Sequence, residues 1–593
     1  MKTKSTYSYL QLLFILSLIG LFFLYYLQYI SYGLPFFVNT DESAFIGSTL
    51  SSFSILTKYF EYNYNPLYAP LLNFIFIIKS LFIGEMLINS LDISQIRLKI
   101  YFNPELFTFY GRVANLLITC VSVFILFLIF KKLKISFKIY SILLITFITS
   151  SAIYNISTVF GKNSSYLLIY LTQLYFVIKY LLKIDKFNFR SYFLMGFLAS
   201  IAWGVNYWPS FISIYGIFLL HFKKFKLSKI NYLLIFFIIF VTFGPIINSY
   251  FVGKLPTEFI SPSNKINLSM ELFLKSFLND IIKSTIIIFS NEKNIILLIF
   301  VTPFFFINKY TNFKKEYLII VFLIFEPIIL FGFSEKIIPQ LRYFAGVNSI
   351  ILILTALTLN ELCKKKDKQA NYLVILLVFI NLYFIYGNFK TTHKINNVIT
   401  KNHSFYNFNK EIDVEKSKIL YLINLKSQET LKQNIFYLEL YQNDLIEKNV
   451  VAKNFIEITK NKIKKIQNIE NFPITNRDLK KDIIYFNYTH LQISDLDKFF
   501  KFISKKFDYI MIEESEVFYL DDPEFQKQLK DYIHKNFLLE KKQFDEDNIF
   551  LRSQTSVIHY FTKSLTRHDY AKNIDKNFNI IYGLNYSLYK LNN

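Results

Sequence analysis

Long apolar runs separated by short basic clusters dominate the first two thirds of this chain. A helix needs about 20 apolar residues to cross a bilayer, and its backbone must bond within its own segment there. Eleven runs approach or reach that length: residues 9–30, 113–130, 139–160, 165–182, 191–206, 207–222, 231–250, 285–307, 317–333, 343–362 and 371–388. The pattern predicts a polytopic α-helical membrane protein.

Composition supports a membrane protein and argues against nucleic-acid binding. The 593 residues are 53% hydrophobic with a mean hydropathy of +0.33, which is too apolar for one soluble domain. The formal net charge is +23, but most basic residues lie in short clusters between apolar runs. Such clusters set membrane topology, so we expect no nucleic-acid partner.

The basic clusters also predict the orientation of the chain. If Met1 is cytoplasmic, the loops predicted on that side hold the densest clusters: Lys131–Lys138, Lys183–Arg190, Lys223–Lys229, Lys309–Lys315 and Lys364–Lys368. Residues 66–87 are apolar but carry Lys79 and Glu85, and a charge at mid-membrane costs about 2.5–3.5 kcal/mol. A span there would also move all five clusters outside. We therefore predict a helix on the outer surface, within one external loop of residues 31–112.

From about residue 390 the composition becomes polar and the pattern changes to alternating strands and helices. The predicted strands are residues 418–423, 482–488 and 508–513, and the predicted helices are 494–507 and a second starting near 521–533. This order indicates a small α/β lobe with a partly parallel sheet. The sequence thus predicts a membrane domain, residues 1–390, and an extracytoplasmic α/β domain, residues 391–593.

Polar side chains gather at the predicted outer ends of the spans. Asp41 and Glu42 follow the first run in "FVNTDESAF", residues 37–45. The others are Lys58, Tyr62 and Tyr64 in the external loop, Arg112 before the second run, Lys162 and Asn163 after the third, Asn206 after the fifth, and Arg342 and Tyr343 before the tenth. Carboxylates and cations would therefore meet on one side of the membrane, above helices that could shelter a lipid tail.

Taken alone, these residues have ordinary structural interpretations. Asp41 and Glu42 could cap a surface helix. Arg112 and Arg342 could anchor helices at the interface, and Lys162 could be a loop charge. The tyrosines could belong to an aromatic belt.

The order of the motifs resembles the GT-C glycosyltransferases, in the branch of protein O-mannosyltransferases, aminoarabinose transferases and lipopolysaccharide galacturonosyltransferases. The shared features are the acidic pair, an aromatic–Pro–Leu surface helix and an Arg-led second span ending in paired lysines, "GRVANLLITCVSVFILFLIFKK" (111–132). A polar turn "GKNSS" (161–165), an aromatic–Pro turn "GVNYWPS" (204–210) and a late "RY" follow. The resemblance covers residues 9–362 and lies in position and order.

The resemblance implies inverting transfer of a sugar from a polyprenyl-phosphate donor to an extracytoplasmic lipid, glycan or protein. It implies a bacterial plasma membrane protein, and the basic clusters of the loops predict its cytoplasmic N-terminus. A phosphate leaving group needs no general acid, but the reaction needs a base and cations. On this hypothesis Asp41 is the base and Glu42 orients the acceptor. Arg342, Lys162, Arg112 and Lys58 bind the donor phosphate, and Tyr62, Tyr64, Asn163, Asn206 and Tyr343 bind substrate.

Two positions depart from the family pattern. Many relatives have an acidic residue where this chain has Asn163, and lysine where it has Asn206. The first departure leaves us without assigned metal ligands, with a divalent ion as an open alternative. Other functions also stay open: a transporter or lipid flippase, a membrane-anchored glycan-binding or assembly protein, and a polymerase or ligase using a diphosphate donor.

Overall fold

The computed structural model describes a helical unit and a second unit built around a sheet. The described residues are 2–28, 30, 104–158, 161–205, 207–225, 227–247, 278, 297, 345–364, 371–372, 374–383, 385–386, 419–423, 474–476, 483–487, 496–505, 507–513, 523–543 and 586–591. The predicted boundary between residues 390 and 391 lies outside them and stays a prediction.

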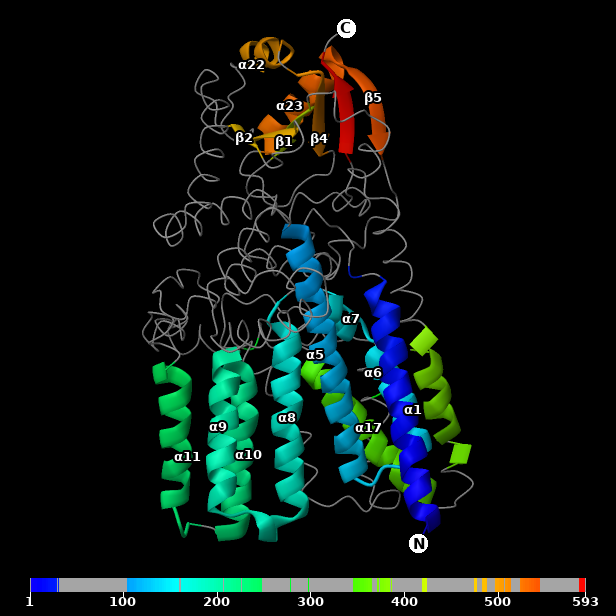
Figure 1. The fold of residues 1–593 in the computed structure, drawn as a ribbon, viewed down its shortest axis with the longest axis vertical. Helices are drawn as coiled ribbons and strands as arrows, with labels where there is room; N and C mark the ends of the chain where they lie inside the picture. Colours follow the sequence, from blue (N-terminus) through cyan, green and yellow to red (C-terminus); the bar gives the residue numbers. More distant parts are fainter. Residues whose placement is uncertain are drawn as a thin grey trace, which may run out of the picture. The chain divides into compact units, whose positions relative to one another are not determined.

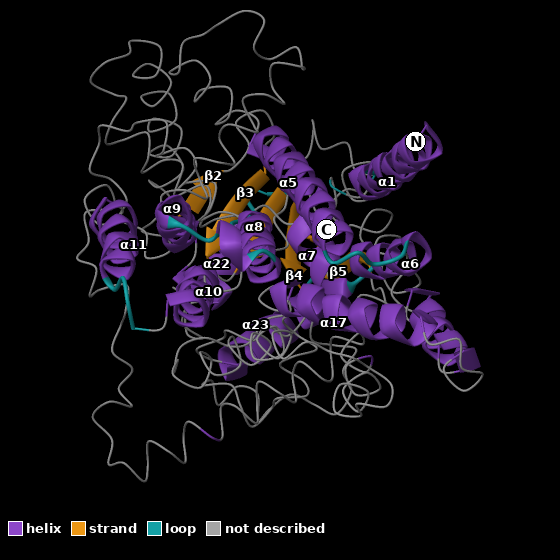
Figure 2. Cartoon of the chain, turned by 90° about the horizontal axis from the view of Figure 1, so that it is seen from below, coloured by secondary structure: helices purple, strands orange, loops and turns teal. Residues whose placement is uncertain are grey.

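In the helical unit, the consecutive helices α8, α9, α10 and α11 run in alternating directions (Figure 1). Its elements are α1 (Lys2–Leu27), α5 (Pro104–Lys132), α6 (Phe137–Ile148), α7 (Ser151–Thr158), α8 (Asn163–Leu182), η1 (Ile184–Lys186), α9 (Phe189–Val205), α10 (Tyr207–Phe225), α11 (Asn231–Val241), η2 (Thr242–Ile246) and α17 (Ala345–Lys364). Figure 2 shows α8 among its neighbours, and it packs against α7, α9, α10 and α17.

Several described helices are suited to a membrane. Those long and apolar enough to cross one are Tyr9–Leu27, Phe109–Lys132, Asn163–Leu182 and Ala345–Lys364, and the bent pair α6 and α7 would add a fifth span. The side chains of Leu13, Leu21 and Leu234 are 64%, 66% and 60% exposed, which is consistent with contact to lipid. The described part is thus mostly helical and membrane-associated in character. The full set of eleven spans stays a prediction.

Helix α5 begins within the predicted external loop. The loop is predicted to extend to residue 112 and to include juxtamembrane helices, and α5 begins at Pro104. Proline suits the first turn of a helix, because the N–H group that it lacks would have no partner there. Arg112 consequently lies in the third turn of α5 and does not open it.

A bend of 59° divides the third predicted span into α6 and α7. Residues 139–160 were predicted as one helix, but α6 ends at Ile148. The Thr149 hydroxyl donates to Ile145 O at 2.9 Å, and Ser150 Oγ accepts the Ile153 N–H at 3.4 Å. Serine and threonine side chains compete for backbone groups in this way, and Ser150 acts as the N-cap of α7.

The second unit contains a six-stranded sheet in the order β2-β3-β1-β4-β6-β5. Strand β1 pairs in parallel with β3 and β4, while the other pairs are antiparallel. The strands are β1 (Ile419–Ile423), β2 (Ile474–Asn476), β3 (Ile483–Asn487), β4 (Tyr509–Glu513), β5 (Leu538–Gln543) and β6 (Tyr586–Lys590). The three predicted strands and the partly parallel sheet are confirmed, whereas β2, β5 and β6 were not predicted.

Two helices of this unit also match the prediction, α22 (Leu496–Ile503) and α23 (Pro523–Asn536). Phe499, Phe500 and Ile533 belong to their buried core. The Tyr532 hydroxyl of α23 donates to Asp497 Oδ1 of α22 at 2.5 Å. Burial, followed by this hydrogen bond and the Asp497 charge, raises the pKa of Tyr532 to about 12.

Candidate functional site

The described residues include three of the predicted site residues, Arg112, Lys162 and Asn163. The others lie outside the described residues and stay predictions: Asp41, Glu42, Lys58, Tyr62, Tyr64, Asn206, Arg342 and Tyr343. All three described residues belong to one end of the helical unit, where α1 and α7 end and α5 and α8 begin (Figure 1). We call this end the α8 end.

Arg112 is fully buried and fixes the chain just beyond α1. Its Nη1 donates to Ile30 O at 2.7 Å. Nearby, the Tyr26 hydroxyl donates to Ile148 O at 3.1 Å and ties α1 to α6. Arg112 therefore has a positioning role at the start of the segment that carries Asp41 and Glu42. Its predicted contact with a donor phosphate stays a prediction.

Helix α8 begins with a polar turn. Lys162 is its N-cap, and its side chain makes no capping hydrogen bond. The Tyr166 N–H donates to Lys162 O at 2.9 Å, which starts the hydrogen-bond ladder of the helix. The N–H groups of Asn163, Ser164 and Ser165 consequently have no acceptor within α8. The positive end of the helix dipole lies at the same turn.

Three side-chain oxygens of this turn are buried and unpaired within the described part of the chain. Asn163 is 8% exposed, and Ser164 and Ser165 are fully buried. Asn163 Oδ1, Ser164 Oγ and Ser165 Oγ have no hydrogen-bond partner there. A Cβ added to Gly161 would lie 3.7 Å from Asn163 Nδ2, so the amide lies close to the residue before the cap. Most buried polar atoms in proteins are paired, so these three atoms on consecutive residues are exceptions that an ordered water or a polar ligand would satisfy.

The sequence analysis missed Ser164 and Ser165. Both are in "GKNSS", but a serine in an apolar helix usually donates to its own backbone. Ser122 of α5 does so, since its hydroxyl donates to Ile118 O at 2.9 Å. Only the packing of α8 distinguishes a serine whose hydroxyl is unpaired from one whose hydroxyl bonds to its own helix.

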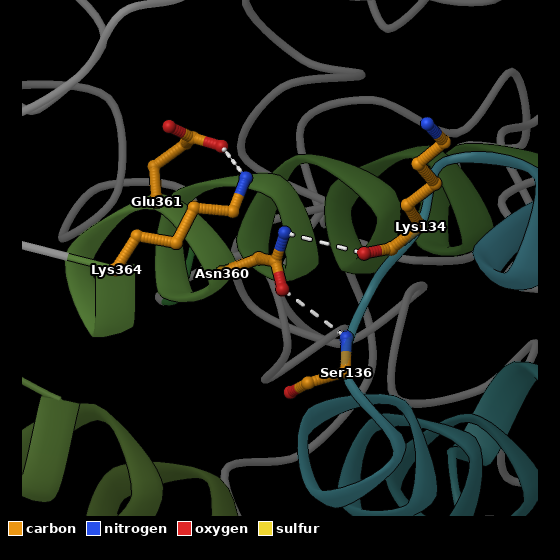
Figure 3. Close-up of polar contacts among 5 residues, drawn as sticks. All are labelled: Lys134, Ser136, Asn360, Glu361 and Lys364. Carbon is orange, nitrogen blue, oxygen red and sulfur yellow. Dashed lines mark hydrogen bonds and ion pairs between the residues drawn. The ribbon is translucent and has the colours of Figure 1, made fainter. Parts of the chain in front are cut away.

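The opposite end of the helical unit, which we call the basic end, contains the turns 133–136 and 183–188. There Asn360 of α17 contacts the turn between α5 and α6 (Figure 3). Its Oδ1 accepts the Ser136 N–H at 3.1 Å, and its Nδ2 donates to Lys134 O at 3.5 Å. Lys224 Nζ donates to Asp185 O at 3.1 Å. Side chains thus satisfy the backbone of these turns.

Within the part of the chain that the structure describes, the α8 end does not have the ligands that a divalent cation prefers. Among the residues that the structure describes, no three His, Cys, Asp or Glu side chains form a group that could hold a metal. The first turn of α8 offers neutral oxygens at the positive end of a helix, next to Lys162. Calcium and magnesium instead prefer several carboxylate or carbonyl oxygens. The turn is chemically suited to an anion.

Comparison with known proteins gives this chain no family assignment. No protein-family model matches the sequence, and a search of curated proteins finds no match.

Proposed function

We propose that the chain is a membrane glycosyltransferase of the GT-C type, with about eleven spans. It moves a sugar from a polyprenyl-phosphate donor to a lipid, glycan or protein acceptor on the outer face of a bacterial plasma membrane. The N-terminus is cytoplasmic in this proposal, and residues 391–593 form an extracytoplasmic domain. This topology places the α8 end outside and the basic end in the cytoplasm.

One structural observation supports the proposal: Ile30, which precedes the acidic segment in the sequence, and the first turn of α8 belong to the same end of the helical unit. Arg112 holds Ile30 O at 2.7 Å, and the segment with Asp41 and Glu42 follows from Ile30. Helix α8 begins at the same end with Lys162 as N-cap. Sugar transfer from a phosphate donor requires a base and groups that bind the phosphate, and the proposal assigns these roles to Asp41 and to this turn.

The mechanism is a single displacement. Asp41 removes the proton of the acceptor hydroxyl while the acceptor oxygen forms a bond to the anomeric carbon. The bond between that carbon and the phosphate oxygen breaks, and its electron pair leaves with the phosphate. Lys162, Arg342, Lys58 and the N-terminus of α8 stabilise the negative charge on the leaving group, with Arg112 holding the adjacent chain. Attack opposite the leaving group inverts the anomeric configuration.

The other proposed residues position the substrates. Glu42 orients the acceptor hydroxyl toward Asp41. The sugar is bound by the remaining polar and aromatic residues of the outer ends, which are Tyr62, Tyr64, Asn163, Asn206 and Tyr343. The phosphate leaves as a stable anion, so the mechanism uses no general acid.

Substitution of the proposed base tests this function. Full-length protein in membranes is assayed with radiolabelled polyprenyl-phosphate sugars. We expect Asp41→Asn to lower the transfer rate by about 10²–10⁴-fold, the usual contribution of general base catalysis. Expression and donor binding should stay near those of the wild type, because the substitution is close to isosteric.

A matched control is Asp185→Asn, the same change at an exposed position of the basic end. Its transfer rate should equal that of the wild type within assay error. If Asp41→Asn retains wild-type turnover, Asp41 is not the base and the mechanism fails.

A further inference from the structure

We infer that the first turn of α8 is an anion site that binds phosphate oxygens through the Ser164 and Ser165 hydroxyls, the Asn163 amide and the backbone N–H groups. Ser164 and Ser165 thereby become ligand-binding residues. The preference for an anion follows from the contacts of this turn. The identification of that anion as the phosphate of a lipid-linked sugar donor rests on the proposed function.

The helix end supplies the first part of the site. Helix α8 is 20 residues long, and its N-terminus carries the equivalent of about half a positive charge. Its first N–H groups have no acceptor inside the helix and point beyond its end. Phosphate oxygens accept such bonds without a charged side chain at every oxygen.

The buried side chains supply the second, independent part. Ser164 and Ser165 are fully buried, and neither hydroxyl has a partner among the described residues. A hydroxyl can donate one hydrogen bond to a phosphate oxygen. The Asn163 side chain is 92% buried by the same measure, since 8% is exposed. Rotation of its amide by 180° presents the NH₂ group where the unpaired Oδ1 now lies, because the two orientations have nearly the same shape.

The charge of the site favours an anion over a cation. A cation would lie at the positive end of the α8 dipole, next to the Lys162 position, and the side-chain oxygens that the described residues Asn163, Ser164 and Ser165 offer it are neutral. An anion there gains from the dipole and from each donor. A carboxylate at position 163 would reverse this preference, and the chain has asparagine instead.

The sequence beyond the turn matches an amphiphilic ligand. From Tyr166 to Leu182 helix α8 is mainly apolar, and Asn163–Leu182 is long enough to cross a membrane. A phosphate held at the first turn would therefore place a hydrocarbon tail at the depth of apolar side chains. A polyprenyl phosphate has this order of polar head and apolar tail, whereas free phosphate shares only the head.

Binding of radiolabelled polyprenyl phosphate to the full chain in lipid nanodiscs tests the site. We expect the double variant Ser164→Ala and Ser165→Ala to bind at least about tenfold more weakly, because hydrogen bonds to a charged group are the stronger class. The matched control is Ser122→Ala, another fully buried helical serine, whose hydroxyl bonds to its own helix. The control should bind like the wild type.

Substitution at position 163 separates an anion site from a cation site. We expect Asn163→Asp to weaken polyprenyl phosphate binding more than Asn163→Ala does, because a carboxylate repels the phosphate. Wild-type phosphate affinity in the double serine variant overturns the site and leaves buried water as the partner of the hydroxyls. Tighter Mn²⁺ binding by Asn163→Asp with unchanged phosphate binding also overturns it.

Competing ligands identify the source of the phosphate. Neutral polyprenol should compete poorly, and inorganic phosphate should compete more weakly than the lipid. Equal competition by inorganic phosphate would overturn the lipid assignment. Serine-dependent binding without sugar transfer by the wild type would overturn the proposed function but support the anion site. Sugar transfer by the wild type, with lipid binding that does not depend on the two serines, would support the proposed function but overturn the anion site.

Discussion

The two ends of the helical unit differ in whether their buried and turn-forming polar groups have hydrogen-bond partners among the described residues. At the basic end, Asn360 accepts the Ser136 N–H at 3.1 Å and donates to Lys134 O at 3.5 Å (Figure 3). At the α8 end, Ser164 and Ser165 are buried without a partner among the described residues. At the basic end, side chains pair with the backbone groups of the turns. At the α8 end, two buried hydroxyls have no such pairing among the described residues.

This difference indicates that the polar groups of the basic end contribute to stability and those of the α8 end to ligand binding. A paired polar group contributes modestly to folding, whereas a buried unpaired one costs about 1–3 kcal/mol. Unpaired polar groups of this kind are expected at functional sites, where a bound ligand supplies the missing hydrogen bonds. His221 breaks the pattern at the basic end, because its Nδ1 lies 2.6 Å from the Tyr192 hydroxyl while its Nε2 has no described partner. It is a single atom, however, and does not form a cluster at a helix N-terminus.

The largest expected effect on stability comes from Arg112, the buried tie at the α8 end. Arg112→Ala removes the bond to Ile30 O and leaves a cavity, so we expect a loss of about 2–4 kcal/mol in the free energy of unfolding. Denaturant unfolding of the full chain in detergent measures it.

Arg190→Ala is the control for Arg112→Ala, since Arg190 is exposed at the basic end and its loss should cost at most about 0.5 kcal/mol. A stable Arg112→Ala protein that no longer binds polyprenyl phosphate would make Arg112 a phosphate ligand. That result would contradict the positioning role inferred from the Ile30 contact.

A smaller effect is expected at the basic end. Asn360→Ala leaves the Ser136 N–H and Lys134 O without their partner, which should lower the free energy of unfolding by about 1–2 kcal/mol. Polyprenyl phosphate binding should not change. The measurement pairs unfolding with the nanodisc binding assay on the same preparations.

The adjacent Glu361 provides the control for Asn360. It pairs with Lys364 at 2.5 Å near the surface, and exposed pairs contribute about 0.2–1 kcal/mol at most. Glu361→Ala should therefore destabilise less than Asn360→Ala. If Asn360→Ala weakens phosphate binding as much as the double serine variant does, the functional division between the two ends is wrong.

The sequence predicts local features of the fold and misses those that depend on single polar residues. Apolar periodicity identified the region of α8 and the strands β1, β3 and β4, because these signals lie within the segments themselves. It missed the bend at Ser150 and the early start of α5 at Pro104, which an apolar average hides. It also missed β5 and β6, whose pairing joins residues far apart in the chain.

The candidate site was predictable in position but not in detail. Topology brought Lys162 and Asn163 to the predicted outer end, and the structure adds their neighbours Ser164 and Ser165. A hydroxyl in an apolar helix has the same sequence signature whether it bonds to its own backbone, as in Ser122, or stays unpaired. Burial and pairing are tertiary properties, so the sequence pattern alone could not select these serines.

The smallest expected effect is a change in the free energy of unfolding without ligand. Its sign tests whether the two ends of the helical unit differ. Without ligand, the double variant Ser164→Ala and Ser165→Ala should be as stable as the wild type or more stable by up to about 1 kcal/mol, because it removes buried unpaired hydroxyls. With polyprenyl phosphate at 100 times its Kd, the wild type should gain about 2.7 kcal/mol and the variant less, so their order reverses. Unfolding with and without the lipid measures both values. A variant that is less stable than the wild type without ligand would show that these serines serve the fold, and the α8 end would then not differ from the basic end.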